Sequence, residues 1–102
     1  YNAAKAAQIS FVKSLAREVA AKGVTVNAVA PGSILWKGGG WDRRQQADPT
    51  AIAEFVRQEM PLGRFGTVDE VASVVTFVCS QQASLVNGAV IAVDGGQSRS
   101  GI

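Results

Sequence analysis

The sequence predicts an α/β fold in which two parallel strands are joined by a helical crossover. Apolar residues repeat at helical spacing over residues 3–22 and again after Thr67, which predicts two helices. Residues 24–30 and 89–93 are strand-length, rich in β-branched residues and nearly apolar on both faces, as expected of buried parallel strands. The order helix, strand, long insertion, helix, strand is that of a βαβ arrangement. With 102 residues, the chain can bury one modest core.

The first helix and the first strand have clear boundaries. The helix is rich in alanine, which raises its intrinsic propensity, and Gly23 supplies its end. Pro31-Gly32 ends the strand over residues 24–30 abruptly. The inward face of the helix is expected to carry Ile9, Val12, Leu15, Ala16, Val19 and Ala20.

A long insertion, about residues 33–62, follows the first strand. Gly38-Gly39-Gly40 is interpreted as a flexible run. Asp48-Pro49 offers a helix cap and a first-turn proline, which predicts a short helix with Ile52, Phe55 and Val56 inward. Because the insertion comes directly after a strand, we expect it to be a lid that covers substrate. A plain surface excursion is the alternative.

The second helix is expected to start at a capping box. The Thr67 hydroxyl can accept the N–H of Glu70, and the Glu70 carboxylate can reach back. Val71, Val74, Val75 and Val78 share one face of this helix, and Cys79 follows the same pattern. We therefore expect Cys79 to be a buried, inert thiol. Asn87-Gly88 predicts a turn before the last strand, and Asp94-Gly95-Gly96 closes that strand.

Composition argues against several classes of protein. A single Cys and the absence of His argue against a disulfide framework and a conventional zinc site, so no metal is expected. The net charge is only +2 and the basic residues are scattered. Arg43-Arg44 beside Trp41 is interpreted as a solvated loop, and no nucleic-acid partner is predicted. The longest apolar runs are strand-length, so no membrane-spanning helix is predicted.

Tyr1 and Lys5 form a candidate proton-transfer pair. They are four residues apart, which places them on the same face of a helix. A nearby ammonium favours the phenolate and draws a tyrosine pKa down from about 10, toward the range of a general acid or base. Such a spacing also arises by chance, and a surface pair on an alanine-rich helix is the alternative.

The predicted sheet is too small to be complete. Two parallel strands need further strands beside them and helices on both faces. We therefore expect an N-terminal portion to precede Tyr1.

Four motifs in a fixed order together resemble the C-terminal half of a classical short-chain dehydrogenase/reductase. They are the Tyr1/Lys5 pair, Asn-Ala-Val-Ala-Pro-Gly at residues 27–32, Pro-Leu-Gly-Arg at residues 61–64 and Val-Asp-Gly-Gly at residues 93–96. The resemblance implies that residues 1–102 are the C-terminal part of a Rossmann-type doubly wound parallel sheet. It also implies that the N-terminal dinucleotide-binding half is absent.

The resemblance implies a role for each matching residue. Tyr1 would be the general acid or base, and Lys5 would hydrogen-bond the nicotinamide ribose and support ionisation of Tyr1. Pro31 and Gly32 would turn the chain past the nicotinamide, at the carboxyl end of their strand. Ile34 would meet the carboxamide of the nicotinamide through its backbone. The catalytic residues expected are thus Tyr1 and Lys5, and the cofactor-binding residues Lys5, Pro31, Gly32, Ser33 and Ile34.

One position departs from the family pattern. Many relatives carry Thr where this chain has Trp36, and that hydroxyl helps to hold the cofactor phosphates. Either Ser33 substitutes for it, or Trp36 packs over substrate or cofactor. The glycine-rich phosphate loop and the catalytic serine of the family lie upstream, so we expect this chain by itself to be inactive.

The function implied is that of an NAD(P)-dependent oxidoreductase that transfers hydride between nicotinamide and an alcohol or carbonyl substrate. The residue that selects NAD or NADP is not in this chain, so both cofactors stay open. The resemblance further implies a cytoplasmic homotetramer or dimer, with the helix after Thr67 and the strand at residues 89–93 at a subunit interface. The alternative is a non-catalytic fragment that acts only as a folding or oligomerisation module.

Overall fold

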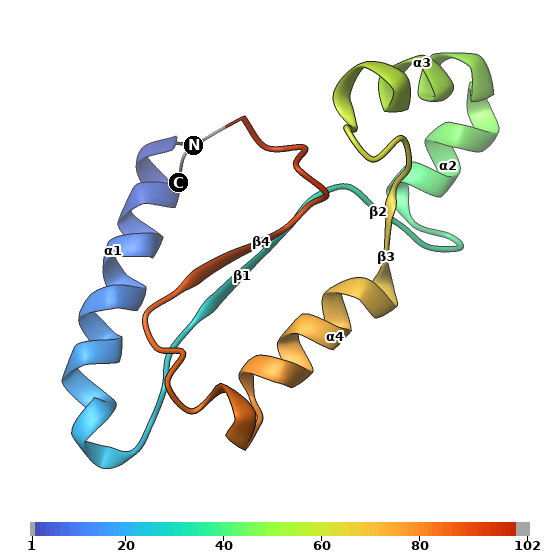
Figure 1. The fold of residues 1–102 in the computed structure, drawn as a ribbon. Helices are drawn as coiled ribbons and strands as arrows, with labels where there is room; N and C mark the ends of the chain where they lie inside the picture. Colours follow the sequence, from blue (N-terminus) through green and yellow to red (C-terminus); the bar gives the residue numbers. More distant parts are fainter. Residues whose placement is uncertain (1, 100–102) are drawn as a thin grey trace.

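The computed structural model describes residues 2–99, and its centre is a pair of parallel strands. Strand β1 (Ala28–Pro31) pairs with β4 (Val90–Val93), from Ala28 opposite Val90 to Pro31 opposite Val93. Figure 1 shows this pair running between helix α1 (Asn2–Val19) and helix α4 (Val68–Val78). The predicted α/β class with parallel strands is therefore confirmed. Tyr1 lies outside the described residues.

Helix α1 has the extent that the sequence predicts. It continues into a single 3₁₀ turn, Ala20–Lys22, and ends at Gly23, whose φ of 76° is left-handed. The Gly23 N–H donates to the Ala20 carbonyl at 3.0 Å, which closes the last turn. On the sheet side, Lys13 Nζ donates to the Gly88 carbonyl at 2.8 Å. This bond attaches α1 to the loop that leads into β4.

The first strand is shorter than predicted, because two asparagine side chains replace ladder bonds before it. The Val26 N–H donates to Asn87 Oδ1 at 3.0 Å. Asn27 bonds Val86 and Ala89, donating to the Val86 carbonyl and accepting the Ala89 N–H, each at 3.0 Å. Regular pairing therefore begins at Ala28 instead of at residue 24. The prediction of buried strands is also wrong, since each residue of β1 and β4 is intermediate in burial or exposed.

The insertion is more ordered than predicted. It contains helix α2 (Gly40–Ala47), helix α3 (Pro49–Glu59) and strand β2 (Ile34–Leu35), which pairs in parallel with β3 (Gly66–Thr67). In the run Gly38-Gly39-Gly40, Gly38 has a left-handed φ of 83° and its N–H donates to Asp42 Oδ2 at 2.9 Å, and Gly39 is the N-cap residue of α2. The predicted cap of α3 is confirmed, since Asp48 Oδ1 accepts the Ala51 N–H at 3.1 Å.

An apolar cluster joins the two helices of the insertion to Phe65, which follows it. Buried Ile52, Met60 and Phe65 form its centre, and Leu35, Trp41, Phe55 and Val56 pack against them. The Trp41 ring stacks on Phe55 with centroids 4.9 Å apart and meets Phe65 at 5.2 Å. The Arg44 guanidinium lies 4.8 Å from the Trp41 ring. Trp41 is thus an anchor of the insertion, and the predicted inward face of α3 is confirmed.

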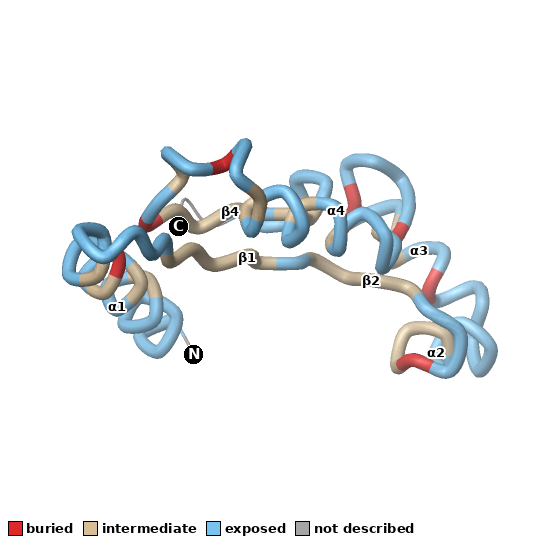
Figure 2. The backbone as a smooth tube through the Cα atoms, turned by 90° about the horizontal axis from the view of Figure 1, so that it is seen from below, coloured by how far each residue is buried: buried red, intermediate tan, exposed pale blue. Residues whose placement is uncertain are grey.

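Helix α4 begins at the predicted capping box. Thr67 Oγ1 accepts the Glu70 N–H at 3.1 Å, and Glu70 Oε1 accepts the Thr67 N–H at 3.0 Å. The helix is only partly covered, however: Val75 and Phe77 are 42% and 47% exposed. Cys79 is exposed as well, so the prediction of a buried thiol is wrong. Figure 2 shows how much of the backbone around β4 and α4 is exposed or intermediate.

No helix among residues 2–99 is long and apolar enough to cross a membrane.

Candidate functional site

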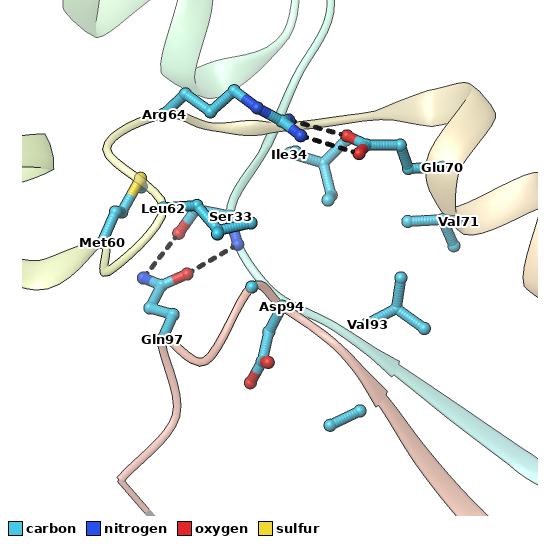
Figure 3. Close-up of a pocket in the computed structure, with 13 residues that line it drawn as sticks. Ser33, Ile34, Met60, Leu62, Arg64, Glu70, Val71, Val93, Asp94 and Gln97 are labelled. Atoms are coloured by element: carbon cyan, nitrogen blue, oxygen red, sulfur yellow. Dashed lines mark hydrogen bonds and ion pairs between the residues drawn. The ribbon is translucent and has the colours of Figure 1, made fainter.

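The candidate site lies where β1 and β4 end. Carboxyl ends of parallel strands meet at one edge of a sheet, and ligands of open α/β sheets bind there. The segment Pro31–Gly32–Ser33–Ile34 leaves β1, and Asp94–Gly95–Gly96–Gln97 leaves β4. The Gly32 N–H donates to the Val93 carbonyl at 3.1 Å, so the two segments stay together beyond the strands. Figure 3 shows Ser33 and Gln97 facing each other across this edge, with the Asp94 side chain directed away from Ser33.

Gln97 joins the two segments by two side-chain bonds. The Ser33 N–H donates to Gln97 Oε1, and Gln97 Nε2 donates to Ser33 Oγ, each at 3.0 Å. Asp94 shapes the turn before Gln97, because its carboxylate accepts the Gly96 N–H at 2.9 Å and the Ser98 N–H at 3.1 Å. The Ser33 side chain and amide are therefore tied to the end of β4.

Gly32 is required by this close approach. A Cβ at Gly32 would come within 2.7 Å of Asp94 Cβ, 2.9 Å of Asp94 Cα and 2.9 Å of Gln97 Oε1. Two of these contacts are with the Asp94 backbone and its first side-chain atom, which cannot rotate away. The Pro31-Gly32 turn predicted from the sequence is thus a point where two backbones nearly touch.

We expect Gly32→Ala to lower the free energy of unfolding by about 1–3 kcal/mol, the usual cost of forcing an extra carbon into a packed site. Denaturant unfolding would measure the loss. Gly40→Ala is the matched control, since a Cβ at Gly40 meets only the Arg43 side chain, at 4.0 Å. Equal stability of the two variants would contradict the steric requirement at Gly32.

The backbone N–H of Ile34 points away from strand β3. The Gly66 N–H donates to the Ser33 carbonyl at 3.1 Å. Because the described peptide bonds are all trans, the Ile34 N–H points opposite to that carbonyl. Gly66 allows the strands to approach, since a Cβ there would come within 2.8 Å of Ile34 Cδ1. The turn therefore presents a fixed backbone donor on the side that β3 does not occupy.

A cavity of about 150 Å³ lies beside the turn. Its lining includes the apolar side chains of Met60, Leu62 and Val71 and the polar side chains of Gln97 and Asp94 (Figure 3). Arg64 and Glu70 close one end with two bonds of 2.9 Å each.

The Arg64 guanidinium lowers the pKa of Glu70 from 4.5 to about 2, with a further contribution from the Thr67 backbone N–H. Because the folded-state pKa lies below the unfolded value, the ionised carboxylate stabilises the fold above about pH 4.5. That contribution is lost as the pH falls toward about 2.

We therefore expect Glu70→Gln to be less stable than the wild type at neutral pH, and the difference to shrink between about pH 4.5 and 2. Denaturant unfolding across this pH range would measure it. Arg64→Gln should flatten the pH dependence as well, because it removes the main cause of the shift. A stability difference that stays constant across the range would refute the linkage.

A second, larger hollow of about 610 Å³ lies in the insertion. Leu35, Ile52, Val56 and Phe65 supply apolar lining, and Arg57 and Arg64 lie at it as well. Trp36, the position where the sequence departs from the family pattern, is 51% exposed. Its ring lies against Gly39, where a Cβ would come within 2.5 Å of it.

Four of the predicted site residues, Pro31, Gly32, Ser33 and Ile34, are consecutive in the chain, and the structure places this segment against the segment that follows β4. Lys5 lies near the start of α1, and Figure 1 shows that end of α1 in the upper part of the view, to the left of the carboxyl ends of β1 and β4 and apart from them. Sequence reasoning missed Gln97, whose partner Ser33 is far away along the chain. The only local signal was the Asp-Gly-Gly turn that precedes Gln97.

These features define an α/β protein with parallel strands and a candidate ligand turn at their carboxyl edge. Comparison with known proteins is more specific: the chain belongs to the short-chain dehydrogenase/reductase family. A family model described as enoyl-(acyl carrier protein) reductase matches residues 1–98. The predicted family is thereby confirmed.

Among curated relatives, the 3-oxoacyl-(acyl-carrier-protein) reductase FabG of Aquifex aeolicus is 46% identical over 101 residues, which cover 94% of this chain and 36% of the relative. The acetoacetyl-CoA reductase of Shinella zoogloeoides is 40% identical over 97 residues, covering 95% of this chain and 38% of the relative. The chain thus spans little more than a third of the length of these relatives.

A solved structure gives the same result for the fold. It is the NADPH-bound short chain oxidoreductase from Pseudomonas aeruginosa PAO1, described as containing an atypical catalytic center. It is 38% identical, superposes with a TM-score of 0.81, and is matched over 96% of this chain and 38% of its own. The predicted Rossmann-type fold class is confirmed by this match.

Proposed function

We propose that this chain is the C-terminal portion of an NAD(P)-dependent oxidoreductase that interconverts a carbonyl and an alcohol. The observation that carries the proposal is the turn Pro31–Ile34 at the carboxyl edge of β1. Gly32 lets this turn pass against Asp94, and the Ile34 N–H is directed away from β3. A fixed N–H donor at this edge is suited to the oxygen of a nicotinamide carboxamide, which is a hydrogen-bond acceptor.

The proposed roles of the residues follow the family. When bound, the nicotinamide would supply or accept the hydride. Tyr1 would donate a proton to the carbonyl oxygen during reduction and take one from the alcohol during oxidation. Lys5 would hydrogen-bond the ribose of the cofactor and favour the ionised form of Tyr1. Pro31, Gly32 and Ser33 would shape the wall of the nicotinamide site, and Ile34 would bind the carboxamide through its backbone.

We also propose that an N-terminal dinucleotide-binding half completes the site. Two observations support it: within residues 2–99 the β1–β4 sheet has only two strands, and no residue of either strand is buried. That half would supply the phosphate loop, the substrate-orienting serine and the choice between NAD and NADP. NADPH is the cofactor to test first, because the similar Pseudomonas aeruginosa structure is described as NADPH-bound.

The insertion at residues 33–62 is proposed to cover substrate. The apolar cluster that it forms with Phe65 packs its helices, and the hollow of about 610 Å³ beside that cluster offers an apolar surface. The names of the relatives from Aquifex aeolicus and Shinella zoogloeoides support a 3-oxoacyl thioester as the first substrate to test.

Subunit association is proposed to use α4 and β4, in a cytoplasmic dimer or tetramer. Val68, Val75 and Phe77 are 52%, 42% and 47% exposed on α4, and burial of such side chains between subunits is favourable. The same exposed side chains would also suit a non-catalytic folding or oligomerisation module. Intact mass separates the two: a natural product well above 10.6 kDa supports the oxidoreductase, and one of 10.6 kDa supports the module.

The test of the proposed activity is turnover by the full-length protein. NADPH and NADH would each be mixed with acetoacetyl-CoA, and consumption of the reduced cofactor followed by absorbance. We expect consumption that requires both protein and thioester. Absence of consumption with either cofactor, across acyl thioesters, ketones and the reverse reaction with alcohols, would overturn the proposed function.

A further inference from the structure

We propose that Gln97 is a positioning residue for the nicotinamide end of the cofactor, a role that rests on the proposed function. Its amide spans from the segment after β4 to the segment after β1. The Ser33 N–H donates to Gln97 Oε1 and Gln97 Nε2 donates to Ser33 Oγ, each at 3.0 Å (Figure 3). A side chain that both donates to and accepts from one residue fixes that residue's position and its orientation.

Gln97 is itself held before any ligand binds. Its N–H donates to the Asp94 carbonyl at 3.0 Å, and its side chain is half-buried. The turn that precedes Gln97 has a left-handed backbone at Gly95 and Gly96, with φ of 59° and 83°, which glycine adopts without strain. The Asp94 carboxylate accepts two N–H groups of this turn. Gln97 is therefore a preorganised group and not a loose surface amide.

Hydrogen bonds to the two peptide groups on either side of Ser33 fix the direction of the Ile34 N–H, which is the donor of the proposed site. The Ser33 N–H is held by Gln97, and the Ser33 carbonyl is held by the Gly66 N–H. Together the two bonds set the direction of the Ile34 N–H. The close contact with Asp94 requires that residue 32 has no Cβ. A glycine, however, restricts its own backbone angles less than other residues do, so the peptide that leads into Ser33 is held only weakly by Gly32 itself. Gln97 supplies the restraint that Gly32 lacks.

Two substitutions separate this role from simple packing. Gln97→Leu places an apolar side chain one bond shorter at this position and leaves the Ser33 N–H without its acceptor. Gln97→Glu keeps an acceptor for that N–H, and its second oxygen can accept the proton of the Ser33 hydroxyl, which rotates freely. Gln97→Glu should therefore keep the two hydrogen bonds to Ser33 that Gln97→Leu loses. If Gln97→Leu does not fold, Gln97→Asn replaces it, since a side chain shorter by one methylene cannot make both bonds.

The experiment compares two ligands on the full-length protein by calorimetric titration. NADPH contains the nicotinamide end, whereas 2′-phospho-ADP-ribose lacks only the nicotinamide. We expect Gln97→Leu to bind NADPH about tenfold more weakly, as for one lost oriented hydrogen bond, and to bind 2′-phospho-ADP-ribose as the wild type does. Gln97→Glu should bind both ligands as the wild type does.

Three other outcomes of this binding experiment would each overturn the proposed role of Gln97. Equal NADPH affinity of wild type and Gln97→Leu refutes the role of Gln97 alone. Equal weakening of both ligands indicates a general structural role and refutes positioning. If the wild type binds neither NADPH nor NADH, the proposed function fails and the role of Gln97 fails with it.

Discussion

Replacing Tyr1 with Phe in the full-length protein is expected to reduce kcat by about 100- to 10,000-fold, the usual contribution of a positioned general acid or base. The substitution removes only the phenolic oxygen, so the aromatic ring remains. No other atom of Phe can donate or take the proton. Cofactor affinity should change little, because the proposed contacts with cofactor are made by Lys5 and the turn Pro31–Ile34. Steady-state kinetics and cofactor titration would measure the two effects separately.

The matched control for Tyr1→Phe is Ser14→Ala, which also deletes one hydroxyl but on an exposed position further along α1. It should leave kcat and cofactor affinity unchanged. Substantial turnover by Tyr1→Phe, with unchanged cofactor affinity, would show that another group carries the proton.

Replacing Lys5 with Ala is expected to impair both binding and turnover, since the ammonium is proposed to serve both. Loss of a hydrogen bond from a charged donor should weaken cofactor binding by about 10- to 100-fold. Turnover at saturating cofactor should fall as well, because Tyr1 would lose the cation that favours its ionised form. The measurements are the cofactor dissociation constant and kcat at saturation.

Lys5→Arg and Lys22→Ala are the controls for Lys5→Ala. Lys5→Arg keeps the charge and should retain more of both functions than Lys5→Ala. Lys22→Ala removes an exposed lysine at the far end of the same helical segment and should change neither. A Lys5→Ala variant that keeps wild-type cofactor affinity would contradict the ribose contact.

Those parts of the fold that depend on near neighbours were predictable from the sequence. The capping box of Thr67 and Glu70 and the cap at Asp48 each satisfy backbone groups three residues away. The parallel β1–β4 pair followed from two apolar β-branched runs with a helix between them. In each case the pattern and the physical cause lie within a few residues.

Features that depend on distant partners were not predictable. Asn27 and Asn87 delay the start of β1 through bonds to residues that are far away in the sequence. Strands β2 and β3 have two residues each, which is too short for a periodicity. Cys79 lies on an apolar pattern, but a pattern states only which side chains share a face and not what covers that face.

The candidate site likewise has one part that was predictable from the local sequence and one part that depends on distant partners. The turn Pro31–Ile34 could be found from its proline, its glycine and its position after a strand. Gln97 could not, because its importance comes from meeting Ser33 after the two parallel strands are paired. The requirement for glycine at position 32 likewise comes from Asp94, which only the fold brings near.

Hydride transfer is the central claim, and isotope transfer tests it most directly. The full-length protein would be incubated with acetoacetyl-CoA and NADPH or NADH that carries deuterium on both hydrogens of the reducing ring carbon. Mass spectrometry would then locate the label in the product. We expect a 3-hydroxyacyl thioester with a single deuterium on the new carbinol carbon. A hydroxyacyl product without deuterium, or no product with either cofactor, would contradict the account.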